Sequence, residues 1–182
     1  MLIIVAIILL APPLFLAIIY NSFVSKRNMA EKAFATIDVM LKKRFDLIPN
    51  LVETVKGYAA HERDTLERIV KIRSEALKNG ISDNEKIRLG SECAPLLSRI
   101  LAISESYPDL KANENFLNLQ RNLTEIEEQI SAARRAYNAA VTDFNNACEM
   151  FPGNIFASIF GFSKKTLFIA SDDEKRSNEL KF

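Results

Sequence analysis

The sequence predicts an all-α protein, in which an N-terminal transmembrane helix is followed by an antiparallel up-and-down four-helix bundle with long helices. Three observations favour this class. The first twenty residues carry no charged side chain, apolar residues further along recur at steps of three and four, and the 182 residues include only five glycines and six prolines. These patterns are typical of a membrane helix joined to amphipathic helices.

The apolar run Met1–Tyr20 would span about 30 Å as a helix, which matches the hydrocarbon core of a bilayer. It has neither the basic segment nor the small-residue cleavage site of a signal peptide. We therefore expect residues 1–22 to be an uncleaved anchor; the alternatives are a cleaved signal and a buried helix of a soluble protein. Pro12 and Pro13 predict a kink in this helix.

Basic residues follow the apolar run and predict its orientation, because positive charge concentrates on the cytoplasmic side of membrane helices. The N-terminus is expected outside, and the bundle in the cytoplasm, at the inner (cytoplasmic) membrane. The basic residues are Lys26, Arg27, Lys32, Lys42, Lys43 and Arg44.

The bundle is expected over residues 23–150, beginning with a helix that continues from the anchor to Arg44. A break is predicted at residues 46–50, where Asp46 can cap and Pro49 suits a helix's first turn. The second helix then runs from Pro49 to Lys78.

Ser82 and Glu85 stand at capping-box spacing and predict the start of a third helix, in which Pro95 predicts a bend or a restart near Cys93. Asn113 is the expected cap of a fourth helix from Glu114 to Met150. Apolar residues at steps of three and four predict a coiled-coil-like seam along it. The seam positions are Phe116, Leu119, Leu123, Ile126, Ile130, Ala133, Tyr137, Ala140, Phe144, Ala147 and Phe151.

Four stretches resemble the LemA family of bacterial membrane proteins: IDVMLKKRFDLIPNLVETVKGYAAHE (37–62), SYPDLKANENF (106–116), AYNAAV with DFNNA (136–147) and FPGNIFASIFGF (151–162). The resemblance implies a membrane helix, a cytoplasmic four-helix bundle and no assigned reaction. It also implies, through gene neighbourhood in some bacteria, a membrane heat-shock metalloprotease as partner, and one relative takes part in magnetosome membrane formation. Phe45, Ala139 and Phe144 stand where the family more often has His, an acid and Tyr, so no role of those polar side chains carries over.

Composition and motifs argue against catalysis and nucleic-acid binding. Lys and Arg number 24 against 23 for Asp and Glu, so no net positive field would attract nucleic acid. His61 is the only histidine, and Cys93 and Cys148 lie in different predicted helices, so no nucleophile pair or metal-ligand spacing is present. We expect no enzyme, no cofactor and no metal.

The predicted topology brings the first and third connections together at the end of the bundle away from the membrane. This tip is a candidate partner-binding site, and the alternative is that its residues only cap helices and set corners. The candidate residues are Asp46, Pro49, Asn50, Tyr107, Asp109, Lys111 and Asn113.

Residues 151–170 form a Phe-rich, membrane-proximal segment, and residues 171–182 are expected to be a flexible tail. Aromatic side chains followed by lysines suit contact with anionic lipid, and the alternative is that the phenylalanines cover the open end of the bundle. The candidate lipid-interface residues are Phe156, Ile159, Phe160, Phe162, Lys164 and Lys165.

The sequence thus predicts a non-enzymatic scaffold or adaptor anchored by a single membrane pass. Its expected partners are membrane lipid and another membrane or membrane-associated protein, with a membrane protease as one candidate. The alternative function is a membrane-organising or membrane-remodelling protein that acts through homo-oligomerisation.

Overall fold

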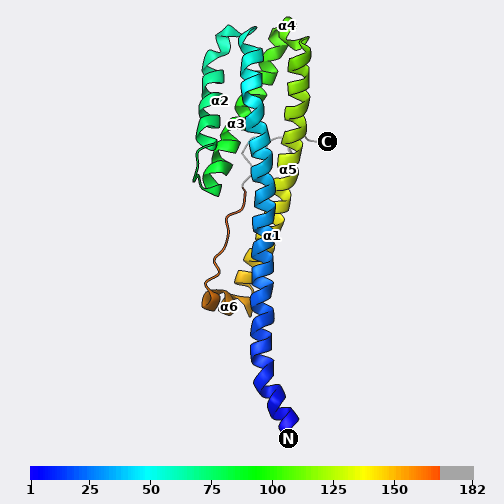
Figure 1. The fold of residues 1–182 in the computed structure, drawn as a ribbon, viewed down its shortest axis with the longest axis vertical. Helices are drawn as coiled ribbons and strands as arrows, with labels where there is room; N and C mark the ends of the chain where they lie inside the picture. The colour runs from blue at the N-terminus through cyan, green and yellow to red at the C-terminus, as the bar shows by residue number, and fades with distance from the viewer. Residues whose placement is uncertain (169–182) are drawn as a thin grey trace, which may run out of the picture. The chain divides into compact units, whose positions relative to one another are not determined.

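The computed structural model describes residues 1–168, and this part of the chain contains helices and no strand (Figure 1). The all-α class and the long apolar N-terminal helix are confirmed. The predicted tail, residues 171–182, lies outside the described residues. The helices are α1 (Leu2–Lys56), α2 (Arg63–Ala76), α3 (Asp83–Ile103), α4 (Pro108–Lys111), α5 (Glu114–Glu149) and α6 (Gly153–Phe160), with 3₁₀ turns η1 (Ala60–Glu62) and η2 (Ser104–Ser106).

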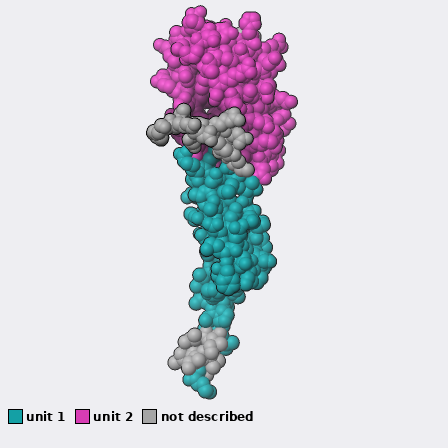
Figure 2. Space-filling view, turned by 180° about the vertical axis from the view of Figure 1, so that it is seen from behind, with its two compact units in different colours: residues 1–36, 133–169 teal, residues 37–132, 170–182 magenta. Residues whose placement is uncertain are grey.

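The described residues form two compact units, which Figure 2 colours separately. Unit 1 contains residues 1–36 and 133–168, and unit 2 contains residues 37–132. Helices α1 and α5 therefore contribute to both units, α6 belongs to unit 1, and α2, α3 and α4 belong to unit 2.

The N-terminal part of α1 is long and apolar enough to cross a membrane. Within Leu9–Lys56, a window of 18 residues has a mean hydropathy of 1.3, and only 6% of that window is buried. A core helix of a soluble protein would be mostly buried over such a stretch. The large exposed side chains are Leu9, Leu10, Leu14, Phe15, Leu16, Ile18 and Tyr20.

The predicted break at residues 46–50 is wrong, because α1 continues without interruption to Lys56. Pro49 lacks the N–H that would bond to the carbonyl of Phe45, four residues earlier. In the structure Arg73 of α2 supplies the missing donor: its Nε donates to the Phe45 carbonyl at 3.0 Å. Asp46 therefore lies within α1 and caps nothing.

The second predicted helix, from Pro49 to Lys78, is also wrong as a single element. The chain leaves α1 at Gly57, where the N–H groups of Tyr58 and Ala59 both donate to the Val55 carbonyl, at 3.0 and 2.9 Å. Helix α2 begins only at Arg63. Glycine is a poor helix former, and Gly57 is the first residue after α1.

The first turns of α3 and α5 confirm the N-terminal caps predicted from the sequence. Ser82 Oγ accepts from the Glu85 N–H at 3.3 Å, and Asn113 Oδ1 accepts from the Phe116 N–H at 3.1 Å. Pro95 lies inside α3, which does not restart near Cys93.

Seven of the eleven predicted seam positions of α5 are buried, and Ile126, Ala140 and Ala147 are half-buried. Two differences from the prediction are larger. Val141 is fully buried where Ala140 was predicted, and Phe151 is 80% exposed. The second difference arises because α5 ends at Glu149, so Phe151 no longer follows the helical repeat.

A fully buried arginine joins three helices in the core of unit 2. Arg44 of α1 donates through Nη1 to Glu127 of α5 at 2.8 Å, and through Nη2 to the Gly90 carbonyl of α3 at 2.5 Å. Gly90 permits the close approach, since a Cβ there would lie 2.8 Å from Leu41 Cδ2 and 3.3 Å from Arg44 Nη2. Glu127 remains half-exposed, with 43% of its side chain accessible.

Candidate functional site

An aromatic cluster in unit 1 fixes α6 against the apolar part of α1. The Phe23 and Phe162 rings stack with centroids 5.0 Å apart, and Tyr20 meets Phe160 edge-on at 5.2 Å. The cluster reaches further towards the N-terminus, where Phe15 meets the ring of Phe156 at 6.2 Å. Aromatic pairs at these separations are favourable beyond the area they bury.

The exposed side of α6 and the residues that precede this helix leave an apolar surface open, which we call the α6 apolar surface. It consists of Met150, Phe151, Ile155 and Ile159. Ile159, for example, is 67% exposed. Large apolar side chains grouped in this way typically mark a membrane or protein contact.

The structure therefore divides the predicted lipid-interface residues into three sets. Ile159 belongs to the exposed surface, whereas Phe156, Phe160 and Phe162 are half-buried in the aromatic cluster. The two lysines are ion-paired: Lys164 Nζ lies 2.5 Å from Glu149, and Lys165 Nζ lies 3.5 Å from Glu31 of α1. The hydrogen bond with Glu149 raises the pKa of Lys164.

Residues 163–168, called the strap below, follow α6 as an extended segment of unit 1 (Figure 1). Two asparagines of α5 pair with its backbone. Asn145 donates to the Lys165 carbonyl and accepts from the Lys165 N–H, both at 2.9 Å. Asn138 does the same with Phe168, at 2.9 and 2.7 Å.

Side chains complete the attachment of the strap. Tyr137 Oη donates to the Thr166 carbonyl at 3.0 Å, and the Arg134 guanidinium lies 4.3 Å from the centre of the buried Phe168 ring. Asn138 of AYNAAV and Asn145 of DFNNA are thus backbone-binding residues, which the sequence analysis did not recognise.

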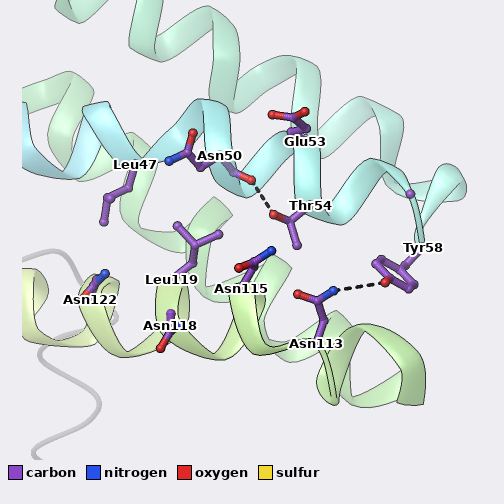
Figure 3. Close-up of a pocket in the computed structure, with 11 residues that line it drawn as sticks. Leu47, Asn50, Glu53, Thr54, Tyr58, Asn113, Asn115, Asn118, Leu119 and Asn122 are labelled. Carbon is purple, nitrogen blue, oxygen red and sulfur yellow. Dashed lines mark hydrogen bonds between the residues drawn. The ribbon is translucent and has the colours of Figure 1, made fainter.

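Unit 2 contains an open groove of about 650 Å³ between the last turns of α1 and the first turns of α5 (Figure 3). Figure 3 shows Asn115 and Leu119 rising from α5 towards α1, and Leu47 reaching from α1 towards α5. At one end Asn113 Nδ2 donates to Tyr58 Oη at 3.2 Å. The groove is lined by Leu47, Asn50, Glu53, Thr54, Gly57, Tyr58, Asn113, Asn115, Asn118, Leu119 and Asn122.

A second hollow continues along the same two helices and shares Leu47 and Asn122 with the first. It adds Lys43, Asp46, Glu125, Ile126 and Gln129. We call the two together the asparagine groove. Its charged residues are Asp46, Glu53 and Glu125 against Lys43, so the groove is acidic on balance.

The structure brings together only part of the predicted tip. Asn50 and Asn113 line the asparagine groove, and Asp46 lines its continuation. Pro49 is exposed within α1. Of the other three, Tyr107 precedes α4, Asp109 is exposed in α4, and Lys111 is paired with Glu105 at 2.5 Å.

Sequence reasoning missed most of the groove. Its signal was available: Asn115, Asn118 and Asn122 recur at steps of three and four on one side of α5, between positions of the apolar seam. Tyr58 could not be placed, because the predicted end of the first helix was wrong.

The cysteines and the histidine lie in separate environments. Burial raises the pKa of the Cys93 thiol to about 11, and Glu127 adds to the effect while Arg44 opposes it, so the thiol is neutral near pH 7. Burial also raises the pKa of Cys148. His61 is exposed, and within residues 1–168 no group of three His, Cys, Asp or Glu side chains is placed to hold a metal ion.

Comparison with known proteins points to one family. The LemA family model matches residues 33–182. Protein LemA of Metamycoplasma hominis is 26% identical over 155 residues, which cover 85% of this chain and 71% of that protein. Magnetosome protein MamQ 2 of Paramagnetospirillum magneticum and magnetosome protein MamQ of Magnetospirillum gryphiswaldense are each 25% identical over 174 residues, covering 82% of this chain and 64% of theirs. The family model covers all of α5 and α6, the strap and the asparagine groove, and the chain belongs to the LemA family.

Proposed function

We propose that the chain is a non-enzymatic adaptor anchored in the membrane, in which unit 1 contacts the bilayer and unit 2 presents a helical surface to a partner protein. The observation that carries the proposal is the α6 apolar surface. It lies in the same unit as the exposed apolar stretch of α1, and the aromatic cluster fixes α6 to that stretch. A bilayer would remove both surfaces from water.

The finer architecture belongs to this proposal. The end of α1, α2, α3 and the start of α5 would be the four helices of an antiparallel bundle. In its support, Arg44 links α1, α3 and α5, and Arg73 of α2 bonds to the backbone of α1. Such a bundle is a rigid support for a binding surface.

The membrane contact of α6 can be tested with a nitroxide label on the full chain in nanodiscs. We expect a label on Ile159→Cys, in a Cys148→Ser background, to be several times more accessible to oxygen than to a water-soluble nickel chelate, because oxygen concentrates in lipid. Continuous-wave power saturation measures both accessibilities.

Val70→Cys is the matched control, since Val70 is also an exposed apolar residue but belongs to α2 of unit 2. Its label is expected to favour the nickel chelate. The proposed contact would be refuted by a label on residue 159 that favours the chelate as strongly as the label on residue 70.

We further propose that the span crosses the inner (cytoplasmic) membrane with unit 2 in the cytoplasm, because the basic residues that follow it favour the cytoplasmic side. A green fluorescent protein fused after Phe182 is expected to fluoresce, and an alkaline phosphatase fused there is expected to be inactive. The reverse pattern would place unit 2 outside.

The non-enzymatic part of the proposal is supported by the chemistry of the described side chains. The Cys93 thiol is buried and neutral, and His61 is exposed in η1. None of the named relatives carries an enzyme's name.

A second candidate function is membrane organisation or remodelling through homo-oligomerisation. The α6 apolar surface supports it, because shallow insertion of apolar side chains spreads lipid headgroups. Two relatives are named as magnetosome proteins, which is consistent with such a role. Tubulation or budding of vesicles by the purified chain, seen by electron cryomicroscopy, would favour this function, and a stoichiometric protein partner without vesicle deformation would favour the adaptor.

A further inference from the structure

We propose that the asparagine groove of unit 2 binds an extended, basic polypeptide segment of a partner protein, and that Asn115 and Asn122 pair with its backbone. The inference rests on the adaptor function proposed above and names the class of partner that the adaptor takes.

The chain itself shows how α5 binds an extended segment. Asn138 and Asn145 are seven residues apart, about 10.5 Å along a helix. They pair with Phe168 and Lys165, which are three residues apart, about 10 Å in an extended chain. The spacing of the two asparagines along the helix therefore matches the spacing of the two paired residues along the strap. Asparagines seven residues apart on a helix can thus pair with an extended segment at two points.

The asparagine groove repeats this spacing without an occupant from residues 1–168. Asn115 and Asn122 are seven residues apart on α5, both are exposed, and neither side chain has a hydrogen bond to another described residue. Asn118, between them, is instead bonded to Arg121. Each free carboxamide offers one donor and one acceptor to a peptide group, as Asn138 and Asn145 do.

The size of the asparagine groove sets the length of the segment. Its lining on α5 runs from Asn115 to Gln129, about 21 Å of helix, which corresponds to about six or seven extended residues. Leu47 and Leu119 form an apolar floor on which every second side chain of such a segment could rest.

Charge sets the composition of the segment. Asp46, Glu53 and Glu125 line the asparagine groove, and Lys43 is its only basic residue within the described chain. Basic side chains are therefore favoured at the positions that face the rim, and a phosphate backbone or anionic lipid headgroup is repelled. These features select a basic polypeptide over a nucleic acid or a lipid.

The test uses the full chain in detergent and two pools of fluorescein-labelled, N-acetylated and C-amidated heptapeptides. In one pool lysine occupies positions 2, 4 and 6 and the other positions vary; in the second pool glutamate replaces lysine. Fluorescence anisotropy is expected to show saturable binding of the lysine pool with a Kd at least tenfold lower than for the glutamate pool. Methylation of the backbone nitrogens of all seven residues is expected to weaken binding at least tenfold, because it removes the donors to both asparagines.

Asn115→Ala together with Asn122→Ala is expected to raise the Kd of the lysine pool at least tenfold, with an unchanged circular dichroism spectrum. Asn146→Ala is the matched control, an exposed asparagine on α5 outside the groove and the strap, and it should leave the Kd unchanged. Absence of saturable binding, or binding that is indifferent to both backbone methylation and the double substitution, would overturn the groove proposal. If a stoichiometric partner is still recovered from membranes in that case, the adaptor function stands and the partner uses another surface.

Discussion

Replacing Glu127 by glutamine is expected to lower the free energy of unfolding by about 3 kcal/mol, because it leaves the buried Arg44 guanidinium without a counter-charge. Replacing Arg44 by methionine is expected to cost less, about 2 kcal/mol. Glu127 is half-exposed and water can solvate it, so the main loss is the donor to the Gly90 carbonyl. Urea denaturation of the full chain in detergent, followed by circular dichroism, measures both changes.

The order of these two effects distinguishes a buried ion pair from a simple packing contact. Arg88→Met is the control, because Arg88 pairs with Glu85 and Glu92 at the surface, and such pairs contribute at most about 1 kcal/mol. A Glu127→Gln variant as stable as Arg88→Met would show that Arg44 does not need its counter-charge.

Replacing Gly153 by alanine is expected to displace α6 from α1 and to destabilise unit 1 by about 3 kcal/mol. An added Cβ would lie 2.2 Å from the Ala147 carbonyl oxygen and 3.3 Å from its carbon, and backbone atoms cannot move aside as a side chain can. Because α6 begins at this residue, the whole helix must shift, and the contacts of Phe156 and Phe160 in the aromatic cluster would weaken. Hydrogen exchange of the full chain in nanodiscs should then be faster over residues 153–160.

Gly57→Ala is the matched control for this substitution, since the nearest atom to its added Cβ is 3.8 Å away. It should leave exchange in α6 unchanged. Equal exchange over residues 153–160 in Gly153→Ala and in the unsubstituted chain would mean that the junction relaxes freely and does not position α6.

Features that depend on neighbouring residues in the chain were predicted well from the sequence. The apolar N-terminal stretch, the Ser82 and Asn113 caps and the extent of α5 all follow from side chains within four residues of one another. The Phe-rich segment was also predicted as a candidate membrane contact, because the apolar and aromatic composition of residues 151–162 is visible in the sequence.

The way these residues divide between two roles was not predictable in the same manner. Ile159 is exposed while Phe160 packs on Tyr20, and only the packing of α6 against α1 decides which side chain faces which way. Likewise, Lys164 and Lys165 were expected to face lipid. Their ion pairs with Glu149 of α5 and Glu31 of α1 form because the strap packs within unit 1, which the sequence does not reveal.

The sequence by itself determined the helical class, the apolar stretch able to cross a membrane and the ends of α3 and α5, because local hydrogen bonding and the periodicity of apolar residues encode them. Only the tertiary structure decided that α1 passes through Pro49, since the donor for the Phe45 carbonyl comes from Arg73, 28 residues away. Only the tertiary structure showed that Asn50 lines the same groove as Asn115 and Asn122. It also showed that Asn138 and Asn145 of α5 bind the strap. The hydrogen-bond partners of these polar groups are distant in the chain, and no local sequence pattern predicts which residue the partner is.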